Sequence, residues 1–205
     1  MNNTTIQLSH SKIIPMIKNV KFDDRDDIYK SLNLGGMTSI NFSQQSSDGL
    51  ELLRYYCANF PDMLCGGGNV QTLGEARNAI EAGAKFILSP LFDPQMVELC
   101  QNNGIAIYPV LTDGVVAVEY GLETIALYPI EKHGGLDMVE KLYSQFGLTS
   151  IVAGSITDQS VNNYLSHKAV VAVTGSWMIT KDHLASRSFD KISIACQKTL
   201  LTVGE

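Results

Sequence analysis

Short apolar runs rich in β-branched residues recur along the chain about every 20 to 25 residues. They are continuous rather than strictly alternating, which is typical of parallel strands that are covered on both faces. We therefore predict eight buried strands. They lie at residues 13–17, 39–42, 63–67, 86–90, 106–111, 125–129, 150–154 and 170–175.

Amphipathic stretches of helical period separate these runs, most clearly at 26–36, 48–60, 72–83 and 93–104. Several begin at Asp, Ser or Thr and end at Gly, which are signals for the start and the end of a helix. Eight β-α units predict an α/β protein with a single (β/α)8 TIM-barrel domain over residues 1–205. The alternative is an open, doubly wound sheet.

Composition and charge argue against several classes of function. The chain is 45% hydrophobic and 18% charged with a net charge of −6, which argues against general binding to nucleic acid or an acidic membrane. No apolar run approaches the roughly 18 residues of a membrane span, and the first residues lack a signal-peptide pattern. Four scattered cysteines and four histidines without metal-ligand spacing predict reduced thiols, a cytoplasmic location and no metal site.

Two glycine–serine pairs follow the predicted seventh and eighth strands. In (β/α)8 barrels the chemistry lies at the C-terminal ends of the strands, and the loops after strands seven and eight often bind phosphate. Gly154 with Ser155, and Gly175 with Ser176, would offer backbone N–H groups and hydroxyls to an anion. The alternative is two tight turns that need glycine for steric reasons.

Five motifs in order resemble the 2-keto-3-deoxy-6-phosphogluconate / 4-hydroxy-2-oxoglutarate (KDPG/KHG) aldolase family. The resemblance implies a (β/α)8 class I aldolase, usually a homotrimer, that needs no metal or other cofactor. Such an enzyme cleaves a small anionic keto acid or sugar-acid phosphate to pyruvate and an aldehyde through a lysine Schiff base. The motifs are KIIPMIK (12–18), EAGAKFILSP (81–90), YGL (120–122) with YPIE and GG (128–135), AGSI (153–156) and TGSWM (174–178).

The sequence departs from this family where the chemistry would lie. The Schiff-base lysine falls on Ala126 and the acid/base glutamate on Asn41, while the arginine that holds the substrate carboxylate falls on Gln45. The threonine of the family's third-strand pattern falls on Asn69. Without an amine or a proton shuttle, the resemblance implies that the family reaction by the family mechanism is lost.

Other candidate residues have two readings each. Lys18 either binds a carboxylate or phosphate, or is a rim lysine; Glu131 is either a catalytic acid/base or a capping carboxylate. Tyr128 either contacts substrate or packs in the core. Thr112, with Asp113, either holds a substrate hydroxyl or begins the next helix.

Three hypotheses follow for the function. The protein is an aldolase-family enzyme of altered chemistry that acts on a small keto acid or sugar-acid phosphate. Alternatively, it is a catalytically inactive homologue that binds such a ligand or a partner protein. The third possibility is an aldolase whose nucleophile has moved to Lys18 or Lys132.

Overall fold

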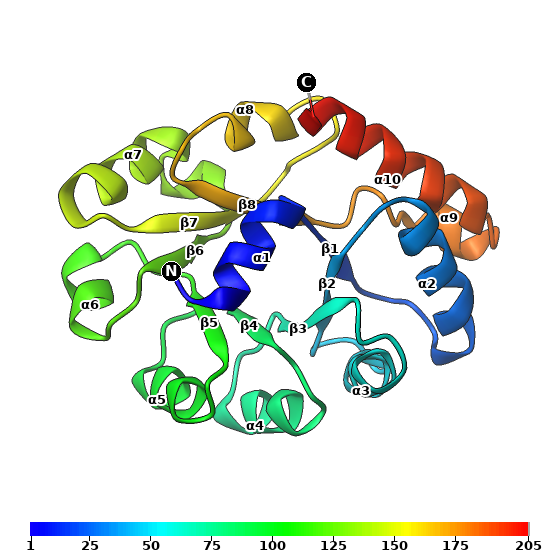
Figure 1. Cartoon of the computed structure of the whole chain (residues 1–205), viewed down its shortest axis with the longest axis horizontal. Helices are drawn as coiled ribbons and strands as arrows, with labels where there is room; N and C mark the ends of the chain where they lie inside the picture. The colour runs from blue at the N-terminus through cyan, green and yellow to red at the C-terminus, as the bar shows by residue number, and fades with distance from the viewer. Residues whose placement is uncertain (205) are drawn as a thin grey trace.

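Eight parallel strands form one continuous sheet that curls into a barrel, in a computed structural model that describes residues 1–204 (Figure 1). The strand order is β5-β4-β3-β2-β1-β8-β7-β6. The (β/α)8 barrel predicted from the sequence is confirmed. The strands are β1 (Ile13–Ile17), β2 (Ser39–Ser43), β3 (Leu64–Gly68), β4 (Phe86–Ser89), β5 (Ala106–Pro109), β6 (Thr124–Leu127), β7 (Thr149–Ala153) and β8 (Val170–Gly175).

The seam between β5 and β6 closes the barrel with little hydrogen bonding. One isolated bridge pairs Val110 with Ala126, and the N–H of Leu111 donates to the carbonyl of Ala126 over 3.4 Å. The other neighbouring strands pair through parallel ladders of two or more residue pairs, with one register shift between Ser150 and Ile151 in the β7–β8 ladder. The barrel is therefore nearly closed, and β5–β6 is its weakest junction.

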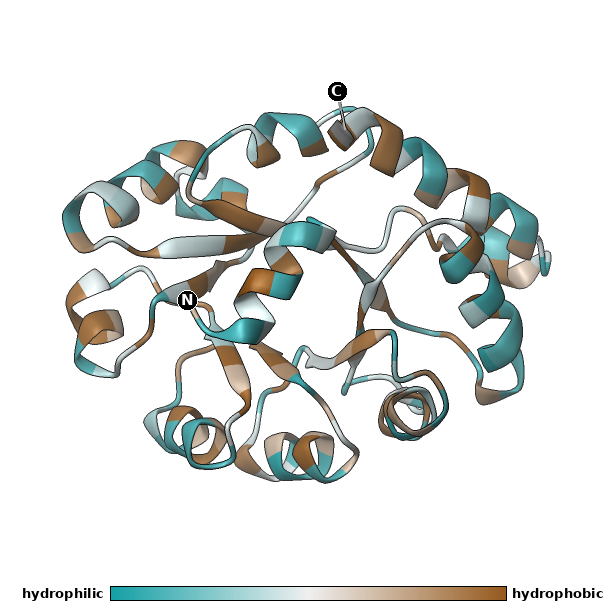
Figure 2. Ribbon diagram, viewed as in Figure 1, coloured by the Kyte–Doolittle hydropathy of each residue, from teal (hydrophilic) through white to brown (hydrophobic). Residues whose placement is uncertain are grey.

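Helices surround the sheet and turn their apolar faces toward it (Figure 2). Thr72 begins α4 with a capping box to Glu75, and Asp93 caps α5. The helices are α1 (Asn3–Ser11), η1 (Phe22–Asp24), α2 (Arg25–Leu34), α3 (Gly49–Asn59), α4 (Leu73–Glu81), α5 (Pro94–Asn102), α6 (Gly114–Glu119), η2 (Ile130–His133), α7 (Gly135–Phe146), α8 (Val161–Leu165), α9 (Lys181–Ala185) and α10 (Phe189–Gly204).

The sixth strand ends earlier than the sequence predicts. We expected 125–129, whereas β6 covers Thr124–Leu127. Pro129 has no N–H to donate to a ladder, and the carbonyl of Tyr128 instead lies 3.0 Å from Nε2 of His133 within the following turn. Tyr128 therefore begins the loop at the C-terminal end of the barrel.

Helix α1 closes the N-terminal end of the barrel (Figure 1). Leu8 is fully buried among inward-facing side chains of the strands, including Ile14 and Phe86. The hydroxyl of Thr5 lies 2.9 Å from the hydroxyl of Tyr108, whose pKa is raised to about 12 by burial. The sequence did not predict this helix, because only Thr5 and Leu8 of its nine residues are buried.

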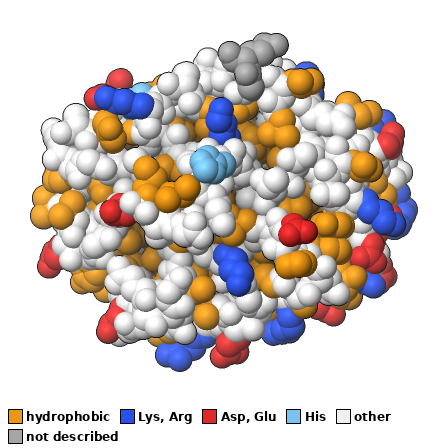
Figure 3. All heavy atoms as spheres, viewed as in Figure 1, with side chains coloured by type: hydrophobic (Ala, Val, Ile, Leu, Met, Phe, Trp, Pro, Cys, Tyr) orange, Lys and Arg blue, Asp and Glu red, His pale blue; other side chains and the backbone are white. Residues whose placement is uncertain are grey.

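The outer face over α1 carries interspersed acidic and basic side chains rather than a field of one sign (Figure 3). None of the helices within residues 1–204 combines the length and the apolar character that crossing a membrane requires.

Replacing the side chain that seals the barrel should destabilise the protein strongly. We expect Leu8→Ala to lower the free energy of unfolding by about 2–5 kcal/mol, because it leaves a cavity in a fully buried site. The matched control is Ile6→Ala on the same helix, where the side chain is 42% exposed and the loss should be small. Urea unfolding measures both, and equal losses would contradict the role of Leu8 as a seal.

Candidate functional site

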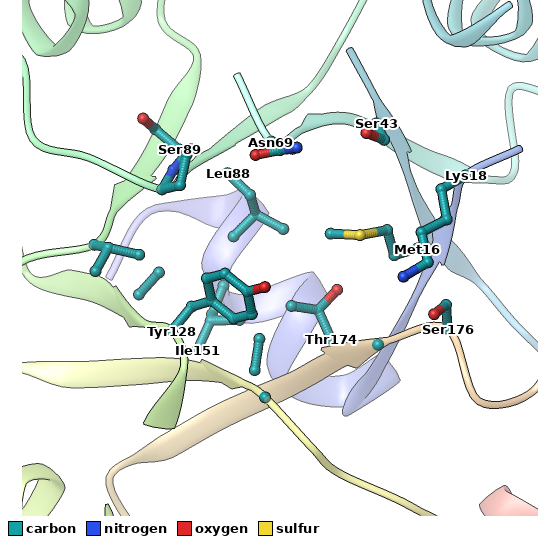
Figure 4. A pocket seen from close by; sticks show the side chains of 16 residues that line it. Met16, Lys18, Ser43, Asn69, Leu88, Ser89, Tyr128, Ile151, Thr174 and Ser176 are labelled. Carbon is teal, nitrogen blue, oxygen red and sulfur yellow. The ribbon is translucent and has the colours of Figure 1, made fainter. Parts of the chain in front are cut away.

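A pocket of about 250 Å³ lies at the C-terminal end of the barrel (Figure 4). It is bordered by the last residue of a strand, or by the residues that follow it, from all eight strands. This is where (β/α)8 barrels carry their functional sites. The lining residues are Met16, Lys18, Ser43, Asn69, Leu88, Ser89, Pro90, Val110, Ala126, Tyr128, Ile151, Ala153, Gly154, Thr174, Gly175 and Ser176.

Ala126 belongs to the inner wall of this pocket. It is 7% exposed and pairs with Ile151 on β7 and with Val110 across the seam. A methyl group therefore occupies the strand position where the family resemblance expects the Schiff-base lysine. It offers neither an amine nor a proton donor to a bound molecule.

Lys18 carries the single formal charge among the sixteen lining residues, all of which lie in the described chain. Its side chain extends from the end of β1 over the pocket toward Ser176 (Figure 4). No acidic side chain lines the pocket, although the whole chain has a net charge of −6. The local potential therefore favours an anion.

Asn41 lies beneath the pocket rather than in its lining. It is fully buried, and its Nδ2 donates to the carbonyl of Pro15 over 3.3 Å and to Oγ1 of Thr174 over 2.9 Å. Its Oδ1 is buried against Gly68 and has no hydrogen-bond partner among residues 1–204. Asn41 thus orients Thr174, which does line the pocket.

Glu131 lies on η2, after β6, and its side chain reaches the turn after β7. Its Oε1 accepts a hydrogen bond of 2.7 Å from the N–H of Ser155, and its carboxylate fills the space beside Gly154 where a side chain would lie. One backbone donor of the predicted phosphate site, the N–H of Ser155, is therefore already bound to a carboxylate of the protein.

The Glu131 carboxylate also affects a neighbouring tyrosine. Partial burial and, secondarily, the charge of Glu131 raise the pKa of Tyr164 on α8.

The second predicted turn is shaped by an aromatic ring. Trp177 packs against Gly175 so closely that a Cβ at that position would overlap the indole, and Nε1 of Trp177 donates to Thr199 on α10. Gly175 therefore has a steric reason to be glycine. Gly154, Gly175 and Ser176 line one pocket, whereas Ser155 is exposed outside it.

Two further candidates lie outside the lining. Gln45 is exposed and donates to the carbonyl of Asn69 and to Glu75 on α4, so that it supports the Asn69 loop. Thr112 is also exposed, and the adjacent Asp113 accepts hydrogen bonds from Val115 and Val116 at the start of α6. The capping reading of Asp113 is thus the one that the hydrogen bonds support.

The structure also adds lining residues that the sequence did not single out. They are inward-facing positions within two residues of a strand end, so the alternation of the strands could have identified them. They are Met16, Leu88, Val110 and Ile151. Within residues 1–204, no three His, Cys, Asp or Glu side chains are grouped so that they could hold a metal ion.

Comparison with known proteins identifies the family. A model of the KDPG and KHG aldolases matches residues 5–195. The chain belongs to this aldolase family.

Individual members of the KDPG/KHG aldolase family resemble the chain over nearly its whole length. It is 28% identical to a 2-dehydro-3-deoxy-phosphogluconate aldolase of Treponema pallidum over 96% of both chains. The identity to the enzyme of that name from Haemophilus influenzae is 29% over 94% of both chains. A crystal structure of KDPG aldolase from Legionella pneumophila, with pyruvate as a covalent carbinolamine, has a TM-score of 0.90. At 22% identity, covering 97% of this chain and 98% of that one, it supports the fold.

Removing the carboxylate beside Gly154 should make the pocket more attractive to anions. We expect Glu131→Gln to tighten the binding of inorganic phosphate about fivefold, because one like charge about 4 Å away costs about 1 kcal/mol in water. Isothermal titration calorimetry measures the change. Glu119→Gln, which alters the net charge equally on the exposed end of α6, is the control. Equal effects in the two variants would show that only the net charge matters.

Proposed function

We propose that this aldolase-family protein binds a small organic anion, a 2-keto acid or a sugar-acid phosphate, and does not form a Schiff base with it. One observation carries the proposal: the pocket has Ala126 in its wall, and Lys18 is the single charged residue of its lining. The pocket retains an electrostatic attraction for an acid, but its inner strand position lacks the amine that the family mechanism needs.

The remaining lysines do not restore that amine at the same place. Lys18 is exposed at the end of β1, whereas Ala126 lies on β6. Lys132 is exposed on η2 and does not line the pocket. A nucleophile must approach the substrate carbon to about 3–3.5 Å, so a relocated lysine would require a different ligand pose. A homotrimer stays an expectation from the family resemblance, and a cytoplasmic location stays an expectation from the scattered cysteines.

Borohydride trapping tests the loss of covalent chemistry. We expect that the protein incubated with pyruvate and borohydride gains no mass, whereas Ala126→Lys gains the mass of one reduced pyruvate, because its side chain can extend into the pocket. Peptide mass spectrometry locates any adduct. Ala153→Lys, another position in the pocket wall, controls for simple proximity of an amine. An adduct on Lys18 or Lys132 of the unaltered protein would overturn the proposal in favour of a migrated nucleophile.

Lys18 should carry the affinity for the anion. We expect Lys18→Met to weaken binding of pyruvate at least tenfold, since a hydrogen bond to a charged group contributes about 1.5–3 kcal/mol. The control is Lys132→Met, which removes the same charge just outside the pocket and should leave the affinity within about twofold. Calorimetric titration distinguishes the two, and similar losses in both variants would show that Lys18 makes no specific contact.

A further inference from the structure

The pocket is divided into a polar side and an apolar side (Figure 4). The polar side comes from the ends of β8, β1, β2 and β3, and the apolar side from the ends of β4 to β7. Adjacent strands of the barrel thus supply each kind of wall. The polar side consists of Lys18, Ser43, Asn69, Thr174 and Ser176, with Met16 of β1 beside Lys18, and the apolar side of Leu88, Pro90, Val110, Ala126, Ile151 and Ala153, with Ser89 and Tyr128 at its border.

Two hydroxyl groups of the pocket lining, Thr174 on the polar side and Ser89 beside the apolar side, already donate their protons within the protein. Thr174 donates to the carbonyl of Ile14 over 2.8 Å and accepts from Asn41. Ser89 donates to the carbonyl of Leu91 over 2.8 Å. A ligand hydroxyl on the apolar side of the pocket would find the half-exposed Tyr128 at the rim, but few other hydrogen-bond partners. Burying such a hydroxyl without a partner is unfavourable.

The end of the pocket at Lys18 is suited to a ligand group with one negative charge rather than two. Lys18 provides a single cation, while Glu131 holds its carboxylate at the Gly154–Ser155 turn and takes the N–H of Ser155. A phosphate dianion at this turn would meet a negative charge where it needs a donor. A carboxylate placed between Lys18 and Ser176 avoids that repulsion.

We infer that the ligand is a carboxylic or 2-oxo acid with a short aliphatic chain, not a polyhydroxylated sugar acid or its phosphate. The carboxylate lies at Lys18 and Ser176, and the chain packs on Val110, Ala126 and Ile151. This inference rests on the proposed function and specifies the chemical class of its ligand. Apolar contact area replaces the hydroxyl contacts that a sugar acid would require.

A homologous series of acids tests the inference by calorimetry. The probes are pyruvate, 2-oxobutyrate and 2-oxovalerate, compared with gluconate and 6-phosphogluconate. The dissociation constant should fall about fourfold with each added methylene, as expected for full burial of that group, until the pocket is filled. The two sugar acids should bind more weakly than 2-oxovalerate.

Two matched valine variants show where the chain lies. Val110→Thr keeps the side-chain shape but replaces a methyl group of the apolar wall with a hydroxyl, so it should remove most of the gain in affinity per added methylene. Val115→Thr, at a site that is 64% exposed on α6, should retain the full gain. A gain that survives Val110→Thr unchanged would overturn the placement of the chain.

The outcomes separate this inference from the proposed function. Affinity that is equal across the series, or tighter for gluconate or 6-phosphogluconate than for 2-oxovalerate, overturns the aliphatic ligand while preserving an anion-binding pocket. Failure of every acid to bind overturns the proposed function itself. A rising affinity along the series, lost in Val110→Thr and kept in Val115→Thr, supports both.

Discussion

The interior of a (β/α)8 barrel must be filled, and the way in which this one is filled determines where a ligand can lie. Leu8 enters from α1 at one end, and the ring of Phe86 occupies the space that the missing side chain of Gly66 leaves. Protein interiors pack as densely as organic crystals, and these groups fill the centre of the N-terminal half. Smaller side chains such as Ala126 and Ala153 leave the C-terminal half open, and the pocket is the remainder.

The polarity of that remainder depends on a small buried hydrogen-bond network. Asn41 links Thr174 to the first strand, so the hydroxyl of Thr174 is held in place and already hydrogen-bonded before any ligand arrives. Where the family resemblance expects an ionisable glutamate, the amide of Asn41 stabilises structure and carries no charge. The family membership therefore establishes the scaffold, while the chemistry of the pocket has to be argued from the side chains that are present.

Sequence reasoning predicted the strands well because their signal is local. The runs at 13–17 and 170–175 coincide with β1 and β8, and the buried apolar periodicity located the rest within a few residues. The same reasoning could not foresee contacts between loops, such as Glu131 with Ser155 or Gln45 with Glu75, because these depend on how separate segments meet. Helix α1 escaped for a related reason: most of its surface is solvated, and its purpose is apparent only once the barrel lies beneath it.

The weak seam between β5 and β6 runs through the pocket. Val110 and Ala126 form its isolated bridge and belong to the apolar wall. A molecule that packs against both residues contacts the two edge strands of the sheet at once and stabilises their junction. Binding in the pocket and closure of the barrel are then thermodynamically linked, since a ligand that binds the closed wall also opposes its opening.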